Sequence, residues 1–420
     1  MEKTSVTAQR RLVIKLFNVK YSPNLGDGLL SEALEHTLIA QGAHAKTTSI
    51  DLAGRTEYGP APLGRGQLLA ALDKLPSKIR QMVVRMPLAV QRRRVWAPHY
   101  AKNIKQVDAV AIGGGNLLSD MDLNFPTKIA AALTAASAHD LPVAFYACGM
   151  GGNWSREGSR RMRRALERWP PQAVFLRDTA SKDRWDSLLA PAAGREATVV
   201  RDPGLLAAEV WPRQSGSMNT SDGAPIIGIG IMSSVAIRYH AEAGTNAQSL
   251  GRWYLELAKL LDRAGAKLRI FTNGAPEDIA AAEAIRQELA GIGPGLQIAR
   301  PHSPAELAGI VSGCDAVVAF RMHAVIAAYS YGVPALALSW DDKLTSFMQS
   351  VKRDDWLRDI AATPPALAAE LLLQAAQEVI AEADRAHVVA EAKDDVGRLM
   401  TALSSAAGSQ AAADGFSAAL

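Results

Sequence analysis

The chain is poor in cysteine, in long apolar runs and in net charge, and each scarcity narrows the class of protein to which it can belong. Its two cysteines, Cys148 and Cys314, both lie in apolar sequence. We expect them to be buried free thiols, as is typical of a reducing compartment. They cannot form a metal site, and we expect no bound metal or cofactor. The net charge of +4 is small for 420 residues, so no overall signature of nucleic-acid binding exists.

Long apolar runs are also missing. No stretch reaches the roughly 18 uninterrupted apolar residues that a membrane-spanning helix needs. Residues 1–20 do not resemble a signal peptide, because Lys15 interrupts their apolar run. We therefore expect a cytoplasmic protein. The hydrophobic fraction of 48% is that of a globular protein, and the length is sufficient for two domains with filled cores.

Acidic residues are absent between Lys74 and Val107, where nine lysines or arginines are interleaved with apolar side chains. One interpretation is that residues 74–105 form a helical surface that rests on anionic lipid, which would make the protein peripheral on the inner membrane. A solvated basic face, or a segment that covers the active-site cleft, would give the same pattern. These interpretations stay open.

Strand-like and helix-like segments alternate along most of the chain, which predicts parallel sheets covered by helices on both faces. The alternation stops in a segment rich in Ser, Gly, Asn and Pro and then restarts. The fold class that this predicts is α/β, with two Rossmann-like doubly wound domains facing across a cleft. The expected divisions are an N-terminal domain (1–211, with a basic insertion at 52–105), a linker (212–224), a C-terminal domain with the donor site (225–353), C-terminal helices (354–402) and a disordered tail (403–420).

The most informative segment runs from Cys314 to Gln349 and reads CDAVVAFRMHAVIAAYSYGVPALALSWDDKLTSFMQ. It predicts one right-handed strand–helix–strand crossover whose two strands end at the same edge of a sheet. Arg321, His323 and Lys343 follow these strand ends, where open α/β sheets bind ligands. Two cations and a titratable imidazole at a helix N-terminus indicate a site for a small anion that also needs a proton.

Three loops of the first domain carry further candidates. Asn24, Gly26 and Asp27 follow the first strand, and the same pattern would serve a tight turn that caps a helix. The glycines of the second loop indicate close backbone approach or positive φ angles, and their spacing matches neither GxGxxG nor a Walker A loop. In the third loop, an arginine ends a strand and would point toward the crevice. The candidates from these last two loops are Gly114, Gly115, Asn116 and Arg177.

Taken together, five motifs resemble those of the polysaccharide pyruvyl transferase family. They are NLGD, AIGGGNLLSD, LRD..S, DPGLL and FRMHAVIAAYSYGVPALALSWDDK, and their order and spacing match from about residue 12 to residue 349. The resemblance implies two Rossmann-like domains in a glycosyltransferase-B-type arrangement. It also implies transfer of pyruvate from phosphoenolpyruvate to sugar hydroxyls as a ketal, in bacterial exopolysaccharide, capsule or cell-wall polymers. Agreement is poor in 52–105 and after 354, so the resemblance does not indicate the acceptor.

The resemblance also suggests roles for the candidate residues. Arg177, Arg321 and Lys343 would bind the phosphate and carboxylate of phosphoenolpyruvate. The chemistry of this transfer needs a positioned acid, so we expect His323 to be the general acid, with a pKa raised by the bound anion, and Arg321 to act in catalysis beside it. The loops of the first domain, with Asn24, Gly26, Asp27, Gly114, Gly115 and Asn116, would line the donor or acceptor side of the cleft. The expected partners are phosphoenolpyruvate and a lipid-linked sugar acceptor, with no nucleic acid.

Two other functions fit parts of the pattern. A glycosyltransferase of the same architecture could use Asp341 or Asp342 to bind a nucleotide-sugar donor, but it would leave the Arg-x-His turn without a purpose. A non-catalytic scaffold for polysaccharide assembly would depend on residues 74–105 and not on His323.

Overall fold

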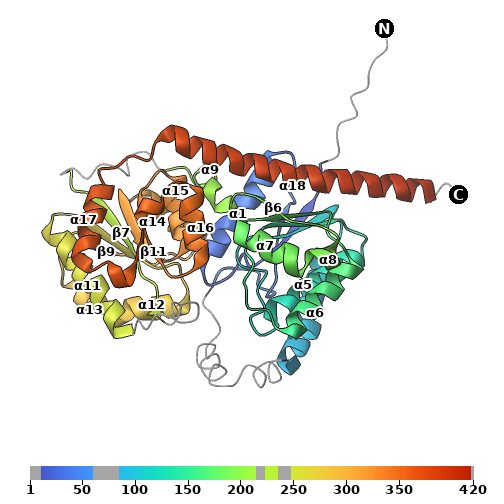
Figure 1. The fold of residues 1–420 in the computed structure, drawn as a ribbon, viewed down its shortest axis with the longest axis horizontal. Helices are drawn as coiled ribbons and strands as arrows, with labels where there is room; N and C mark the ends of the chain where they lie inside the picture. The colour runs from blue at the N-terminus through green and yellow to red at the C-terminus, as the bar shows by residue number, and fades with distance from the viewer. Residues whose placement is uncertain (1–10, 60–84, 214–222, 235–246, 418–420) are drawn as a thin grey trace, which may run out of the picture.

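The computed structural model describes residues 11–59, 85–213, 223–234 and 247–417. Parts of the predicted segments therefore lie outside the described residues: 1–10 of the N-terminal domain, 60–84 of the basic insertion, 214–222 of the linker, 235–246 of the C-terminal domain and 418–420 of the tail. The remaining chain forms two parallel sheets side by side, each covered by helices (Figure 1). The prediction of two doubly wound α/β domains is confirmed.

The first sheet has the strand order β2-β1-β3-β4-β5-β6, and every neighbouring pair is parallel. Its central strands are apolar along their whole length and buried, as expected for a sheet with helices on both faces. The strands are β1 (Ile14–Asn18), β2 (Thr48–Asp51), β3 (Ala109–Gly113), β4 (Val143–Cys148), β5 (Ala173–Leu176) and β6 (Thr198–Val199). The helices are α1 (Leu25–Ala40), η1 (Arg92–Trp96), α4 (Ala97–Asn103), α5 (Asn124–Ser137), α6 (Arg156–Arg168), α7 (Thr179–Leu188), α8 (Ala190–Ala193), η2 (Pro203–Leu206) and α9 (Ala207–Val210).

The second sheet has the order β12-β11-β10-β7-β8-β9 and is again parallel throughout. The strands are β7 (Ile226–Gly230), β8 (Lys267–Phe271), β9 (Leu296–Ile298), β10 (Ala316–Ala319), β11 (Ala335–Ser339) and β12 (Leu357–Asp359). The helices are α11 (Ala247–Arg263), α12 (Pro276–Ala284), α13 (Arg286–Ala290), α14 (Pro304–Ser312), α15 (Met322–Ser330), α16 (Asp342–Ser350), η3 (Asp354–Trp356), η4 (Ile360–Ala362), α17 (Pro365–Ala375) and α18 (Glu382–Ser417). Strands β10 and β11 are direct neighbours, as the crossover segment predicts.

In each sheet, the chain adds strands first toward one edge and then toward the other. The strand where this order switches positions the site. In the first sheet β1 lies between β2 and β3; in the second, β7 lies between β8 and β10. Ligands of doubly wound folds bind at the carboxyl ends of the strands that flank such a switch. The loops after β1, β3 and β10 carry most of the residues predicted from the sequence.

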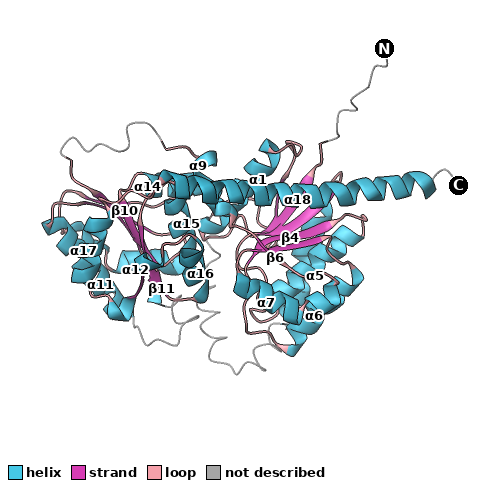
Figure 2. Cartoon of the chain, turned by 45° about the horizontal axis from the view of Figure 1, so that its top comes forward, coloured by secondary structure: helices cyan, strands magenta, loops and turns pink. Residues whose placement is uncertain are grey.

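A shared apolar core joins the two domains. Leu25 and Leu29 of α1 belong to the same buried cluster as Val325 and Ile326 of α15. Helix α18 packs against η2, α1 and β4 of the first domain and against α15 of the second, and it runs along both in Figures 1 and 2. The domains are therefore held by apolar contact as well as by the chain connection.

The C-terminal tail, predicted to be disordered from residue 403, is instead part of α18, which continues to Ser417. Leu403 is fully buried in the shared core. Alanine is the strongest helix former, so a helix anchored by packing extends readily through the alanine-rich residues that follow.

The described part of the basic segment is helical, including η1 and α4. Trp96 is buried against the first domain, and Lys128 lies over its ring, 5.0 Å from the centroid. Met86, Val90 and Val95 are exposed. Among the described residues, no helix combines the length and the apolar composition needed to span a bilayer.

Candidate active site

The N-terminus of α1 forms the contact between the two walls of the site. Asn24 is its N-cap and accepts a hydrogen bond from the Gly26 amide at 3.3 Å. The Leu25 amide donates to the carbonyl of Asn273 in the second domain at 2.7 Å. A side chain at Gly26 would meet His323, because a Cβ there would lie 2.6 Å from the histidine Cβ. Gly26 therefore allows the imidazole to pack directly against α1.

Asp27, in the first turn of α1, is the acidic group that faces this histidine. Its Oδ1 atom lies 3.9 Å from Nδ1 of His323, and its side chain is 18% exposed. Burial raises the pKa of Asp27 to about 6, although Arg321 and Arg177 oppose the rise. The carboxyl group is thus close to half-protonated in mildly acidic solution.

His323, in the first turn of α15, is 8% exposed, and its Nε2 atom has no hydrogen-bond partner among the described residues. Burial lowers its pKa to about 3, and the charges of Arg177, Arg321 and Lys343 lower it further. The imidazole is therefore neutral at pH 7. An anion bound among these cations would offset their repulsion of the imidazolium and raise the pKa of His323.

Arg177 comes from the first domain, at the end of β5. Its side chain is 5% exposed, yet the nearest carboxylate oxygens, of Asp178 and Asp202, are 3.6 and 3.8 Å away. The Nε atom has no hydrogen-bond partner among the described residues. A Cβ at Gly149 would lie 2.5 Å from its Nη2, so this glycine makes room for the guanidinium. Arg177 is a buried cation whose hydrogen-bonding capacity is incompletely used.

Lys343 reaches the same place from the first turn of α16. Its Nζ lies 3.6 Å from Asp341. In the amide orientation that satisfies both neighbours, Asn116 accepts a hydrogen bond from Lys343 at 3.1 Å and donates one to the Gly149 carbonyl at 3.3 Å. Burial, and then the charge of Arg177, lower the pKa of Lys343. Asn116 thus links the two domains at the cation cluster.

Arg321 is placed differently from the sequence-based expectation of a free anion receptor. Its Nε donates to Oδ2 of Asp278 at 2.8 Å, and Glu277 lies 3.6 Å away. Asp278 is fully buried and also accepts a hydrogen bond from the Ser233 amide at 2.9 Å. The guanidinium is anchored from one side, so only its remaining edge can face a ligand.

The glycine loop after β3 has the geometry that its sequence indicates. Gly114 and Gly115 have φ angles of 84° and 72°, a region that favours glycine. A Cβ at Gly114 would lie 2.2 Å from Leu30, and one at Gly115 would lie 3.5 Å from Asp27. The loop therefore passes close to α1, beside the acid that faces the histidine.

Three residues that contact the site were missed by sequence reasoning: Asp278, Asn273 and Asp202. Asp278 and Asn273 follow β8, and only the sheet topology places that strand near β10, with β7 alone between them. Asp202, before Pro203 and Gly204, caps η2 by accepting a hydrogen bond from the Gly204 amide. It also faces Arg177. A carboxylate directly after a strand was the available signal.

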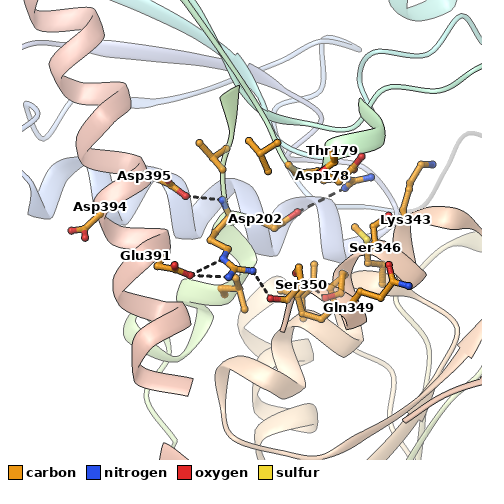
Figure 3. A pocket seen from close by; sticks show the side chains of 18 of the residues that line it. Asp178, Thr179, Asp202, Lys343, Ser346, Gln349, Ser350, Glu391, Asp394 and Asp395 are labelled. Atoms are coloured by element: carbon orange, nitrogen blue, oxygen red, sulfur yellow. Dashed lines mark hydrogen bonds and ion pairs between the residues drawn. The ribbon is translucent and has the colours of Figure 1, made fainter. Parts of the chain in front are cut away.

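A cavity of about 770 Å³ opens between the domains beside Arg177 and Lys343 (Figure 3). Its walls come from the ends of β5 and β6, from η2, and from α15, α16 and α18. Among the described residues, no three His, Cys, Asp or Glu side chains gather in a way that could hold a metal ion.

The family model for polysaccharide pyruvyl transferases matches residues 24–342, and the chain belongs to this family. The match includes the candidate residues described above except Lys343, which lies one residue beyond its end. A comparison with curated protein sequences finds no match.

Solved structures resemble the chain in fold at low sequence identity. A UDP-GlcNAc 2-epimerase from Neisseria meningitidis bound to UDP-GlcNAc has a TM-score of 0.51 and 13% identity, with 93% of this chain and 99% of that chain covered. A UDP-GlcNAc 2-epimerase from Methanocaldococcus jannaschii has a TM-score of 0.50 and 10% identity, covering 89% and 93%. Alr3699/HepE from Anabaena, in complex with UDP and glucose, has a TM-score of 0.50 and 10% identity, covering 96% and 100%. These likenesses support the glycosyltransferase-B-type arrangement of two Rossmann-like domains.

Proposed function

We propose that the protein transfers pyruvate from phosphoenolpyruvate to a sugar of a bacterial exopolysaccharide, capsule or cell-wall glycan precursor, forming a pyruvate ketal and releasing phosphate. Membership of the pyruvyl transferase family supports the reaction class. The observation that carries the choice of donor is the buried, neutral imidazole of His323 beside three cations, with an Nε2 atom that has no hydrogen-bond partner among the described residues.

The cation cluster suits a compact anion. Phosphoenolpyruvate carries about three negative charges, from one carboxylate and one phosphate. Arg177 has incompletely used hydrogen-bonding capacity and is the best placed to take a planar oxyanion group in a bidentate manner. Lys343 would supply a point charge, and Arg321 the free edge of its anchored guanidinium.

His323 would act as the general acid. When the donor's anionic groups lie among the cations, they favour the imidazolium and raise the pKa of the histidine, which burial and the three cations otherwise lower. The proton passes from Nε2 to the methylene carbon of the donor and leaves an oxocarbenium-like centre at the neighbouring carbon. Asp27, 3.9 Å from Nδ1, faces the opposite edge of the ring and would orient it. Such proton transfer contributes about 10²–10⁴-fold to turnover.

The remaining steps balance without a cofactor. One sugar hydroxyl attacks the oxocarbenium carbon, and its proton replaces the one that His323 gave up. The bond from that carbon to the phosphate oxygen breaks, and inorganic phosphate leaves, taking up the proton of the second hydroxyl. A second hydroxyl of the same sugar then closes the ketal. The loops containing Asn24, Gly26 and Asp27, and Gly114, Gly115 and Asn116, would line the cleft on the donor or acceptor side.

A lipid-linked acceptor would place the protein at the cytoplasmic face of the inner membrane. The exposed Met86, Val90 and Val95 lie among exposed arginines of the basic segment, a composition that suits an anionic lipid surface. Co-sedimentation with phosphatidylglycerol vesicles, and not with phosphatidylcholine vesicles, tests this part.

The decisive experiment incubates the protein with phosphoenolpyruvate and a panel of nitrophenyl and lipid-linked sugars. We expect release of inorganic phosphate and a mass gain on the acceptor equal to pyruvate minus water. The alternative, a glycosyltransferase with a nucleotide-sugar donor, predicts release of nucleotide and a mass gain of one sugar residue. That outcome would replace the proposal.

A further inference from the structure

The cavity beside the cation cluster is larger than the proposed donor requires. It measures about 770 Å³ and has Arg177 and Lys343 at one end and α18 at the other. Phosphoenolpyruvate has about ten non-hydrogen atoms, whereas pockets of roughly 300–1,000 Å³ hold drug-sized ligands. Space for a second, larger molecule therefore adjoins the place where the donor would bind.

The charges at the α18 end are already neutralised within the protein. Arg201 donates from Nε and Nη2 to Glu391 at 3.0 and 2.8 Å, and from Nη1 to the Ser350 carbonyl at 2.9 Å (Figure 3). Arg398 pairs with Asp395 at 2.9 Å. Arg201 and Arg398 are thus already ion-paired. The carboxylates that pair with them retain lone pairs that can accept hydrogen bonds from hydroxyl groups. The end suits a neutral polyol better than a diphosphate.

Apolar side chains complete the lining. Leu205 of η2, Ile326 of α15 and Phe347 of α16 line the cavity between the polar groups. A pyranose ring presents hydroxyls around its edge and C–H groups on its faces, so it needs both kinds of contact. At one end lie Arg177 and Lys343, whose nearest carboxylate oxygens are 3.6 Å away, and at the other end hydrogen-bond acceptors lie with apolar surface.

We propose that this cavity is the subsite for the acceptor sugar and that α18 supplies its outer wall. The inference rests on the proposed function and adds the location of the acceptor. A sugar here would direct its reacting hydroxyls toward the Arg177–Lys343 end, where the donor lies. Helix α18 lies outside residues 24–342, the segment that matches the family model. The geometry therefore assigns part of acceptor choice to a helix beyond the segment that defines the family.

The test fills the cavity from two opposite walls. Ser346 of α16 and Thr179 of α7 both line it, and neither is part of the proposed donor site. We expect Ser346→Trp and Thr179→Trp each to raise the KM for the sugar acceptor about tenfold or more, with the KM for phosphoenolpyruvate within about twofold of wild type. Thr134→Trp on the exposed face of α5 is the matched control and should change neither constant.

Binding measurements separate this inference from the proposed function. Calorimetry with phosphoenolpyruvate alone reports on the donor site. Saturation-transfer NMR with p-nitrophenyl galactoside, glucoside, mannoside and N-acetylglucosaminide reports on the cavity. Loss of glycoside binding in both filled variants, with donor binding retained, supports the subsite even if the transfer chemistry differs from the proposal. Unchanged acceptor KM or glycoside binding in both variants overturns it, and so does a wild-type protein that binds none of the glycosides.

Discussion

Arg177 and Arg321 stand on opposite walls of the site and are held in opposite ways. The Arg321 guanidinium lies 2.8 Å from the fully buried Asp278, which fixes its position. Arg177 is more buried than Arg321, at 5% against 17% exposure, yet its carboxylate neighbours are 3.6 and 3.8 Å away. Buried charges are normally paired and hydrogen-bonded, because desolvation is costly. Arg321 is therefore fixed to the second domain's wall by a close ion pair, whereas Arg177 has no carboxylate oxygen within 3.5 Å among the described residues, and we propose that it binds the anion.

The largest expected effect concerns the histidine between these two arginines. We expect His323→Gln to lower kcat by about 10²–10⁴-fold, because it removes the only proposed proton donor and preserves most of the volume. His302→Gln, at an exposed histidine of the same domain, is the matched control and should retain full activity. Steady-state assays with phosphoenolpyruvate measure both. Near-wild-type turnover in His323→Gln would exclude the role.

The anchoring of Arg321 is broken by Asp278→Ala. The substitution leaves a largely buried guanidinium without its main partner, and we expect a loss of about 2–4 kcal/mol in the free energy of unfolding. This range lies below that of a fully buried pair because Arg321 retains 17% exposure. Glu277→Ala, one residue away and 44% exposed, should cost at most about 1 kcal/mol. Urea denaturation measures the free energy of unfolding of both variants. Equal losses in Asp278→Ala and Glu277→Ala would show that Asp278 does not anchor Arg321.

The buried acid of the first wall gives a dependence on pH. The folded-state pKa of Asp27 is about 6, above its usual 3.8, so the folded protein holds this proton more tightly than the unfolded chain. Stability contributed by the protonated form is therefore lost as the pH rises from about 4 to about 6. Relative to Asp27→Asn, we expect the wild-type protein to lose up to about 3 kcal/mol over this interval. Urea denaturation at pH 4 and pH 7 measures it; parallel stability curves would show that the carboxyl is not perturbed.

The smallest effect in this series is expected for Arg177→Met. A charge-assisted hydrogen bond contributes about 1.5–3 kcal/mol, so we expect the KM for phosphoenolpyruvate to rise about 10–100-fold. The free energy of unfolding should change little, because no close ion pair is broken. Because Arg177 lowers the pKa of His323, that pKa should rise in the variant, which NMR titration can detect. Arg184→Met, at the more exposed arginine of α7, serves as the control.

Local sequence was sufficient for much of the second wall. The apolar runs that flank Arg321 and Lys343 form β10 and β11, adjacent and parallel, because a short crossover between buried strands has few alternatives. The positive φ angles of Gly114 and Gly115 could also be predicted locally, because glycine lacks a Cβ and is favoured in this region. Prediction failed where alanine-rich sequence could be either a loose tail or a helix. Only packing of Leu403 and its neighbours decides in favour of α18.

The sequence by itself determined the two doubly wound domains and the strand ends at which the candidate residues lie, because both follow from short-range periodicity and the handedness of crossovers. Tertiary structure alone decided how those residues are charged and paired. Asp278 is 43 residues from Arg321, and Asp27 is nearly 300 residues from His323. Burial between two domains lowers the pKa of the imidazole and raises the pKa of the carboxyl, and burial is a property of the packed chain that no local pattern contains.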